Sequence, residues 1–98
     1  MAKYVLAYKG GNMAATDAER ETAMAAWGAF LGGLGDALVD AGNPFGGSTS
    51  LGDGAAAGLT GYSIVTAGSL EEATAKAQGA PVLANGGGVE VYETLEVM

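Results

Sequence analysis

The sequence predicts an α+β domain whose strands and helices follow the order β-α-β-β-α-β. Residues 3–9 and 89–98 alternate along the chain as strands do, and residues 59–67 are rich in β-branched side chains. Two helix-start motifs, each a hydroxyl residue followed three positions later by glutamate, come after the first and third strand patterns. Glycine and proline residues separate these segments. The pattern therefore favours a sheet with helices packed on it.

The first half of the chain predicts a strand, a long helix and a weak strand. The strand covers residues 3–9 and ends at consecutive glycines. From Thr16 a helix is expected to run to about Ala41, because apolar residues recur at spacings of three and four. Gly42 is placed to end that helix. Residues 45–51 are expected to form the second strand, although they contain glycine and serine.

The second half of the chain predicts two strands with a short helix between them. Residues 59–67 form the third strand. A helix is expected to begin after Ser69 and to end near Ala77 or the next residue, before a glycine and a proline. Residues 80–83 predict a short helical turn. Residues 89–98 alternate apolar and polar side chains, which predicts a last strand with one face in water.

This order is the split arrangement called ferredoxin-like, a four-stranded antiparallel sheet with both helices on one face. Two helices leave the other face uncovered, and a second copy of the chain is the simplest cover for it. The sequence therefore predicts a homodimer formed sheet against sheet. Tyr4 and Tyr8 share one face of the first strand. Tyr62 and Tyr92 lie in other strands, and spacing alone does not fix whether they share that face.

Composition limits the classes of function. The 98 residues predict one domain over 1–98. The net charge of −7 argues against nucleic acid and against anionic membranes, since both need clustered lysine and arginine. The chain has no cysteine and no histidine, so nucleophilic triads and thiolate metal sites are excluded. No apolar stretch has the length of a membrane span or signal segment, and a cytoplasmic location is expected.

A few side chains are candidates for chemistry. Asp36 and Asp40 are four apart in the expected long helix, where two close carboxylates would act as an acid/base pair if buried. Solvated acidic surface is the simpler interpretation. Tyr8 and Tyr62 can donate protons, so these two tyrosines with Asp36 are the candidate catalytic group. Trp27 either lines a small-molecule cavity or fills the core.

Two further patterns favour structural interpretations. Residues 42–49 have the glycine and hydroxyl spacing of a phosphate-binding loop, but they lack its lysine and follow a helix. Glu90 and Glu96 share one face of the last strand, whereas Glu93 faces the other way. Acidic side chains that discourage strand pairing explain this better than a metal site does. No metal and no cofactor are therefore expected.

Four segments in this order resemble the YCII-related family, which includes the DGPF-motif proteins, and the resemblance covers nearly the whole chain. The segments are Leu34–Gly42, Leu59–Val65, Ser69–Ala73 and Gly88–Val91. The resemblance implies a ferredoxin-like dimeric α/β barrel with a cavity between the sheets. Some members of that family look like small lyases or dehalogenating enzymes with a His-Asp pair.

The chain departs from that catalytic pattern. It has no histidine, and the position where the family histidine would be expected falls near Trp27. Asp53 and Gly54 match only the first half of the Asp-Gly-Pro-Phe motif. The residues that would line the implied cavity are Tyr8, Trp27, Tyr62 and Asp53.

Two functions remain open. One is a dimer that binds a small organic molecule in the cavity near its sheet-to-sheet interface, with catalysis unproven. The alternative is a non-enzymatic structural or interaction module whose dimer interface is filled.

Overall fold

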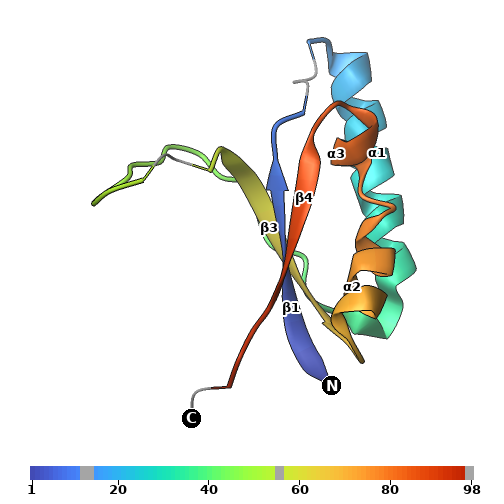
Figure 1. The fold of residues 1–98 in the computed structure, drawn as a ribbon. Helices are drawn as coiled ribbons and strands as arrows, with labels where there is room; N and C mark the ends of the chain where they lie inside the picture. The colour runs from blue at the N-terminus through green and yellow to red at the C-terminus, as the bar shows by residue number, and fades with distance from the viewer. Residues whose placement is uncertain (12–14, 55–56, 97–98) are drawn as a thin grey trace.

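The computed structural model describes residues 1–11, 15–54 and 57–96 and forms an α+β structure. A four-stranded antiparallel sheet has the strand order β2-β3-β1-β4 and carries helices on one side (Figure 1). This arrangement is compatible with a ferredoxin-like fold. The elements are β1 (Ala2–Lys9), α1 (Asp17–Leu34), the 3-10 helix η1 (Gly35–Ala37), β2 (Leu38–Asp40), β3 (Leu59–Ala67), α2 (Leu70–Ala77), α3 (Pro81–Ala84) and β4 (Gly88–Glu93).

Both predicted helix starts are confirmed. The backbone N–H of Glu19 donates to Thr16 Oγ1 over 3.1 Å at the start of α1. The N–H of Glu72 donates to Ser69 Oγ over 3.1 Å at the start of α2. Each cap satisfies an N–H that the first turn of a helix leaves without an internal partner. The third strand and the short helical turn also lie where the sequence predicts them.

The predicted end of the long helix is wrong. Helix α1 stops at Leu34, because Gly35 adopts a positive φ of 55° that a helix does not continue through. The chain then turns through η1 and enters the sheet at Leu38–Asp40 as β2. The second strand therefore precedes the predicted range 45–51, which belongs to no named strand.

The last strand is shorter than predicted. Strand β4 ends at Glu93, and Thr94 continues the contact with β1, because its N–H and its hydroxyl each donate to Lys3 O over 2.9 Å. The predicted end at residues 97 and 98 lies outside the described residues. The predicted alternation is nevertheless confirmed within β4, because Val89 and Val91 pair with core residues of β1.

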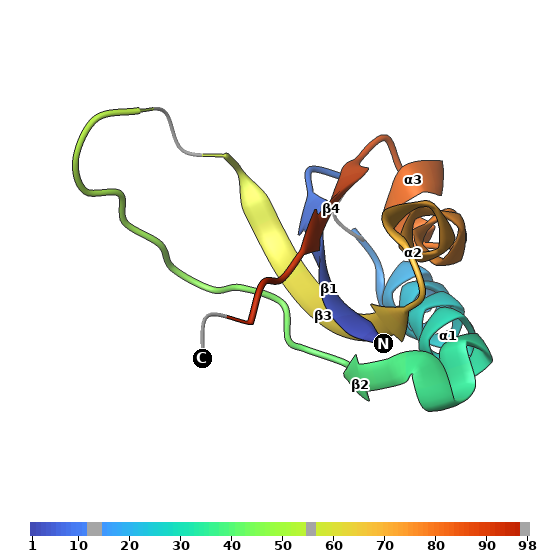
Figure 2. The same cartoon turned by 60° about the horizontal axis from the view of Figure 1, so that its bottom comes forward.

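The core lies between the sheet and the helices. Its buried members from the sheet include Tyr4, Leu6 and Tyr8 of β1 and Val65 of β3. Helices α2 and α3 add alanines and one valine, and α1 contributes only partly buried side chains such as Trp27. Figure 2 shows all three helices against the same face of the sheet.

The chain is less compact than its mass predicts. Its solvent-accessible surface is 6652 Å², against roughly 5,100 Å² expected for a compact monomer of this mass. Its radius of gyration is 14.2 Å, against about 13 Å expected for about 100 residues. Among the described residues, ten large hydrophobic side chains are exposed.

Candidate functional site: the open face of the sheet

The sheet face that points away from the helices is called the open face here. Residues directly opposite each other in neighbouring strands project to the same side, so the register assigns its members. Its central members are Val5, Ala7, Tyr62, Ile64, Glu90 and Tyr92. On β3, Tyr62 and Ile64 face this side, whereas the small Gly61 and Ser63 face the helices. Tyr62 and Ile64 thus project to the side that no helix covers, while Val65 of the same strand packs in the core.

Two rows of side chains cross the open face. Ala7 of β1 stands opposite Tyr62 on one side and Glu90 on the other. Val5 stands in the same way between Ile64 and Tyr92. Each row spans about 9–10 Å from β3 to β4, because neighbouring strands are about 4.8 Å apart. The centre of the open face is therefore apolar, with polar groups at the β4 end of both rows and the Tyr62 hydroxyl at the β3 end of one.

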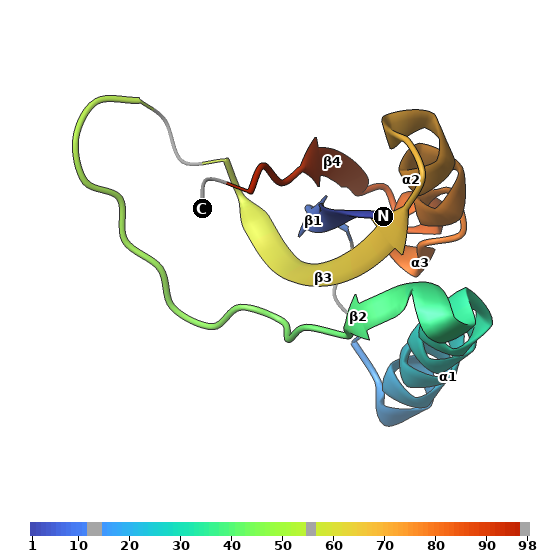
Figure 3. The same ribbon diagram turned by 90° about the horizontal axis from the view of Figure 1, so that it is seen from below.

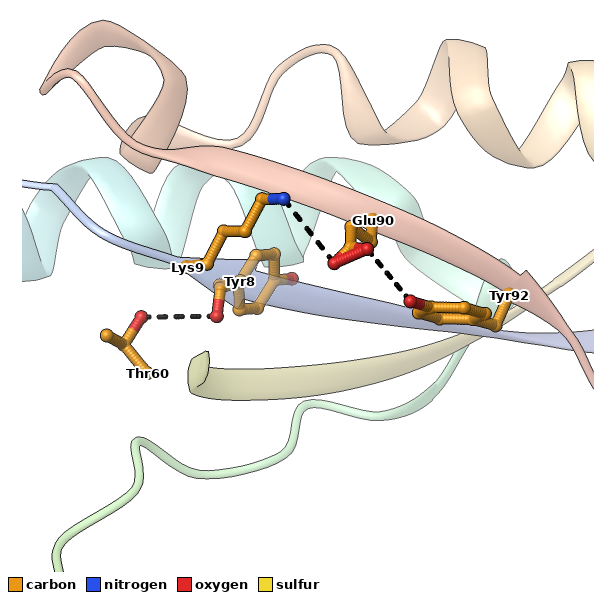
Figure 4. Close-up of polar contacts among 5 residues, drawn as sticks. All are labelled: Tyr8, Lys9, Thr60, Glu90 and Tyr92. Carbon is orange, nitrogen blue, oxygen red and sulfur yellow. Dashed lines mark hydrogen bonds and ion pairs between the residues drawn. The ribbon is translucent and has the colours of Figure 1, made fainter. Parts of the chain in front are cut away.

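One edge of the open face holds a polar group from β1 and β4, called the polar margin (Figure 4). Tyr92 donates its hydroxyl proton to Glu90 Oε1 over 2.9 Å, and Lys9 Nζ lies 3.5 Å from Glu90 Oε2. The hydrogen bond from Tyr92, and then the charge of Lys9, lower the pKa of Glu90. The same hydrogen bond and the negative charge of Glu90 raise the pKa of Tyr92. At neutral pH the polar margin therefore presents a carboxylate, an ammonium and an intact phenol.

The other edge holds an aromatic pair, called the aromatic margin. The rings of Phe45 and Tyr62 are stacked, with centroids 5.8 Å apart and an interplanar angle of 20°. The Tyr62 hydroxyl makes a long hydrogen bond of 3.5 Å to Asp40 Oδ2. Asp40 Oδ1 accepts the N–H of Gly42 over 2.8 Å, which fixes the carboxylate. The sequence did not predict that Phe45 and Asp40 contact Tyr62, because it placed the second strand at residues 45–51 instead of Leu38–Asp40.

Tyr8 lies on the opposite side of the sheet from Tyr62. Only 5% of its surface is exposed, because α1 covers it. Its hydroxyl donates to Ser63 Oγ over 2.8 Å, and its ring meets Trp27 edge-on with centroids 4.8 Å apart. Burial raises the pKa of Tyr8, although the hydrogen bond with Ser63 opposes that shift. Tyr62 therefore does not share the face of Tyr4 and Tyr8, a question that the spacing of these residues left open.

The remaining candidates do not gather around Tyr62. Trp27 packs in the core between Tyr8 and Phe30, with ring centroids 5.9 Å apart for the second pair. Asp36 is exposed in η1, and Asp40 is in β2, so the two carboxylates do not share a helix face. Asp53 is exposed in the segment between β2 and β3. The predicted group of Tyr8, Tyr62 and Asp36 is thus divided between two faces and a surface turn.

Two of the hollows formed by the described residues lie away from the open face. The larger of these is an open groove between α1 and the α2–α3 segment, lined by alanines and glycines together with Phe30, Leu34, Glu19 and Lys76. The smaller is a shallow depression among glycines beside Lys9. Within residues 1–11, 15–54 and 57–96, no three acidic side chains gather as a metal site would require. None of the helices described has both the length and the apolar character that crossing a membrane requires.

Comparison with known proteins gives no relative from which to infer a role. No family model matches the chain, and no significant match is found among curated protein sequences or among solved structures. The resemblance to YCII-related proteins therefore stays a prediction from the sequence.

Proposed function

We propose that this chain acts as a homodimer in which two open faces pack against each other and hold a small organic molecule between them. The observation that carries this proposal is that β3 directs two large side chains, Tyr62 and Ile64, away from the helices. Side chains of this kind are placed where they are removed from water. A second copy supplies that cover in the form of a ferredoxin-like dimeric α/β barrel, as the resemblance to YCII-related proteins also implies.

The area available is sufficient for such an interface. The chain exposes roughly 1,500 Å² more than a compact monomer of its mass. A stable protein interface of standard size removes about 800 Å² from each partner. The open face and the segment beside it can therefore supply one partner's share without any change in the core.

The two margins define the kind of molecule that this interface would hold. The floor formed by Val5, Ala7 and Ile64 suits an apolar or aromatic body. Lys9 and Glu90 at the polar margin can pair with a hydrogen-bonding group of that molecule. Between facing sheets a side chain as small as Ala7 leaves the most room. The proposed ligand is thus a small organic molecule with one polar end.

One observation favours the alternative of a filled interface. Ala7 is only 5% exposed, so its neighbours already fill the space around it at the centre of the open face. If the two faces interdigitate, the dimer is a structural or interaction module and binds nothing. Methyl NMR of Val5, Ala7 and Ile64 separates the two cases. Phenols, lactones and halogenated aromatics should shift these signals if the proposal holds, and unchanged signals at millimolar ligand would support the filled interface.

Dimerisation is tested by a matched pair of charge substitutions. Tyr92 on the open face is 52% exposed in the single chain, and Leu83 on α3 is 44% exposed. Neither side chain is buried in the core, so both Tyr92→Asp and Leu83→Asp should fold. Sedimentation should show that Tyr92→Asp shifts the equilibrium to monomer, while Leu83→Asp dimerises like the unaltered chain. Equal behaviour of the two variants would refute an interface on the open face.

A further inference from the structure

The segment that follows β2 is held firmly where it begins. Gly42 has a φ of 74°, and a Cβ atom there would collide with the carbonyl oxygen of Tyr62. Asp40 Oδ1 accepts the N–H of Gly42, and Ser63 Oγ donates to Ala41 O over 2.7 Å. These contacts fix both the position and the direction of the chain as it leaves β2.

The same segment then pairs briefly with β3. Pro44 forms an antiparallel bridge with Gly61, and the N–H of Phe45 donates to Thr60 O over 2.8 Å. Two antiparallel segments that meet in this way are normally joined by two to five residues. A tight hairpin turn after Phe45 would therefore complete the connection to Leu59.

The chain instead makes a long excursion. Thirteen residues, 46–58, connect Phe45 to Leu59. All three views show residues 46–54 extending from the body of the molecule on the side opposite the helices (Figure 3). Residues 46–54, called the arm here, are all exposed, and no hydrogen bond or ion pair joins them to other described parts of the chain. Connections longer than about 12 residues are uncommon in compact domains, and they are usually either functional loops or linkers.

The composition of the arm suits contact with another protein. Leu51 is 92% exposed, which leaves a large apolar side chain almost wholly in water. Asp53 is the one charged residue among residues 46–54. A chain with a net charge of −7 repels a second copy of itself, and a nearly neutral segment avoids that repulsion. The arm follows directly after Phe45 of the aromatic margin, so it continues from the proposed interface.

We propose that the arm crosses to a second copy of the chain and packs Leu51 against the partner beside its open face. This inference rests on the proposed homodimer, whose two-fold symmetry would make each chain give one arm and receive one. The arm then accounts for part of the surface excess of the single chain, and it closes the rim of the space between the two sheets. The length of the excursion follows from this role, because a short turn would end before reaching the partner.

Two variants test the arm. In Leu51→Ser the apolar contact is lost from both arms, and dimerisation should weaken at least about tenfold. Replacing residues 46–58 by Asn-Gly should weaken it further, because that dipeptide closes a hairpin without an arm. Leu83→Ser is the control and should change the dissociation constant less than about twofold. Circular dichroism checks that each variant folds. If the shortened chain does not fold, the dissociation constant of Leu51→Ser tests the arm contact by itself.

Sedimentation and limited chymotrypsin digestion give distinguishable outcomes. Cleavage at Leu51 should be slow at concentrations where the chain dimerises and fast on dilution to monomer. If Leu51→Ser and the shortened chain dimerise like the unaltered chain, the arm contact is refuted while the dimer stands. If Leu51 is equally protected in the monomer, the arm packs on its own chain and the inference falls. A full chain that is monomeric at every concentration would overturn the dimer and the arm together.

Discussion

The hydroxyl of Tyr8 donates a 2.8 Å hydrogen bond to Ser63 Oγ, and Ser63 in turn donates to the carbonyl of Ala41. This relay connects β1 to β3 and β3 to the segment after β2. It lies beneath α1, where Tyr8 also meets Trp27. One buried polar group thus joins the core to the base of the projecting segment, and it makes Tyr8 a structural residue.

Removal of Ser63 should cost more stability than removal of the Tyr8 hydroxyl. Ser63→Ala leaves the buried Tyr8 hydroxyl without its partner, which should lower the free energy of unfolding by about 2 kcal/mol. Tyr8→Phe removes the hydroxyl itself and leaves Ser63 bonded to Ala41, so the loss should be about 1 kcal/mol. Urea denaturation measures both values. A smaller loss for Ser63→Ala than for Tyr8→Phe would show that the relay is not formed.

Two glycines with positive φ should respond differently to alanine. Gly42→Ala places a Cβ atom against the Tyr62 carbonyl, so it should destabilise the chain by about 3 kcal/mol or more. Gly52 has a similar φ of 78°, but a Cβ atom there meets nothing within 4 Å. Gly52→Ala should therefore cost only about 1 kcal/mol. Thermal unfolding of the two variants measures both losses of stability. Equal losses would contradict the close packing of Gly42 against the Tyr62 carbonyl.

Helix α1 should depend on Trp27 for its attachment to the sheet. Trp27→Ala removes the ring that contacts Tyr8 and Phe30, and it should lower the free energy of unfolding by about 3 kcal/mol. Met24 on the same helix is 74% exposed, so Met24→Ala should change stability by less than about 0.5 kcal/mol. Denaturant titration distinguishes the two variants. If Trp27→Ala proves as stable as Met24→Ala, Trp27 is not a core residue. The other prediction for it, that it lines a small-molecule cavity, would then be favoured.

The polar margin makes a prediction for acidic pH. The pKa of Glu90 is lowered in the folded chain, first by the Tyr92 hydrogen bond and then by Lys9. A lowered pKa stabilises the folded chain above the ordinary pKa of glutamate, and that stabilisation is lost as the pH falls through the folded value. NMR titration of the Glu90 carboxyl should show a higher pKa in Tyr92→Phe than in the unaltered chain. The same pKa in both would mean that Tyr92 does not donate to Glu90 in solution.

Local patterns predicted the parts of the fold that depend on neighbouring residues. The capping residues Thr16 and Ser69 identified both helix starts, because a hydroxyl and a glutamate three positions apart satisfy the same N–H groups wherever they occur. The predicted end of α1 was wrong because local patterns do not distinguish among neighbouring glycines. Several glycines lie in and after α1, and the sequence alone does not tell which of them adopts the positive φ found at Gly35.

The site depends on contacts across strands, which local patterns do not encode. The spacing of Tyr4 and Tyr8 shows that they share a face, but the side to which Tyr62 points is set by its pairing with Ala7. One signal was present in the sequence. Along β3 the small residues alternate with larger ones, and a strand whose larger side chains face away from its helices indicates a second covering surface.

The most direct test of the central claim is the mass of the unaltered chain in solution. Light scattering coupled to gel filtration at micromolar concentration should give twice the 9.6 kDa of one chain, because a second copy is proposed to cover the open face from solvent. A mass of one chain across the whole concentration range would contradict the proposal, since Tyr62 and Ile64 would then stay in contact with solvent.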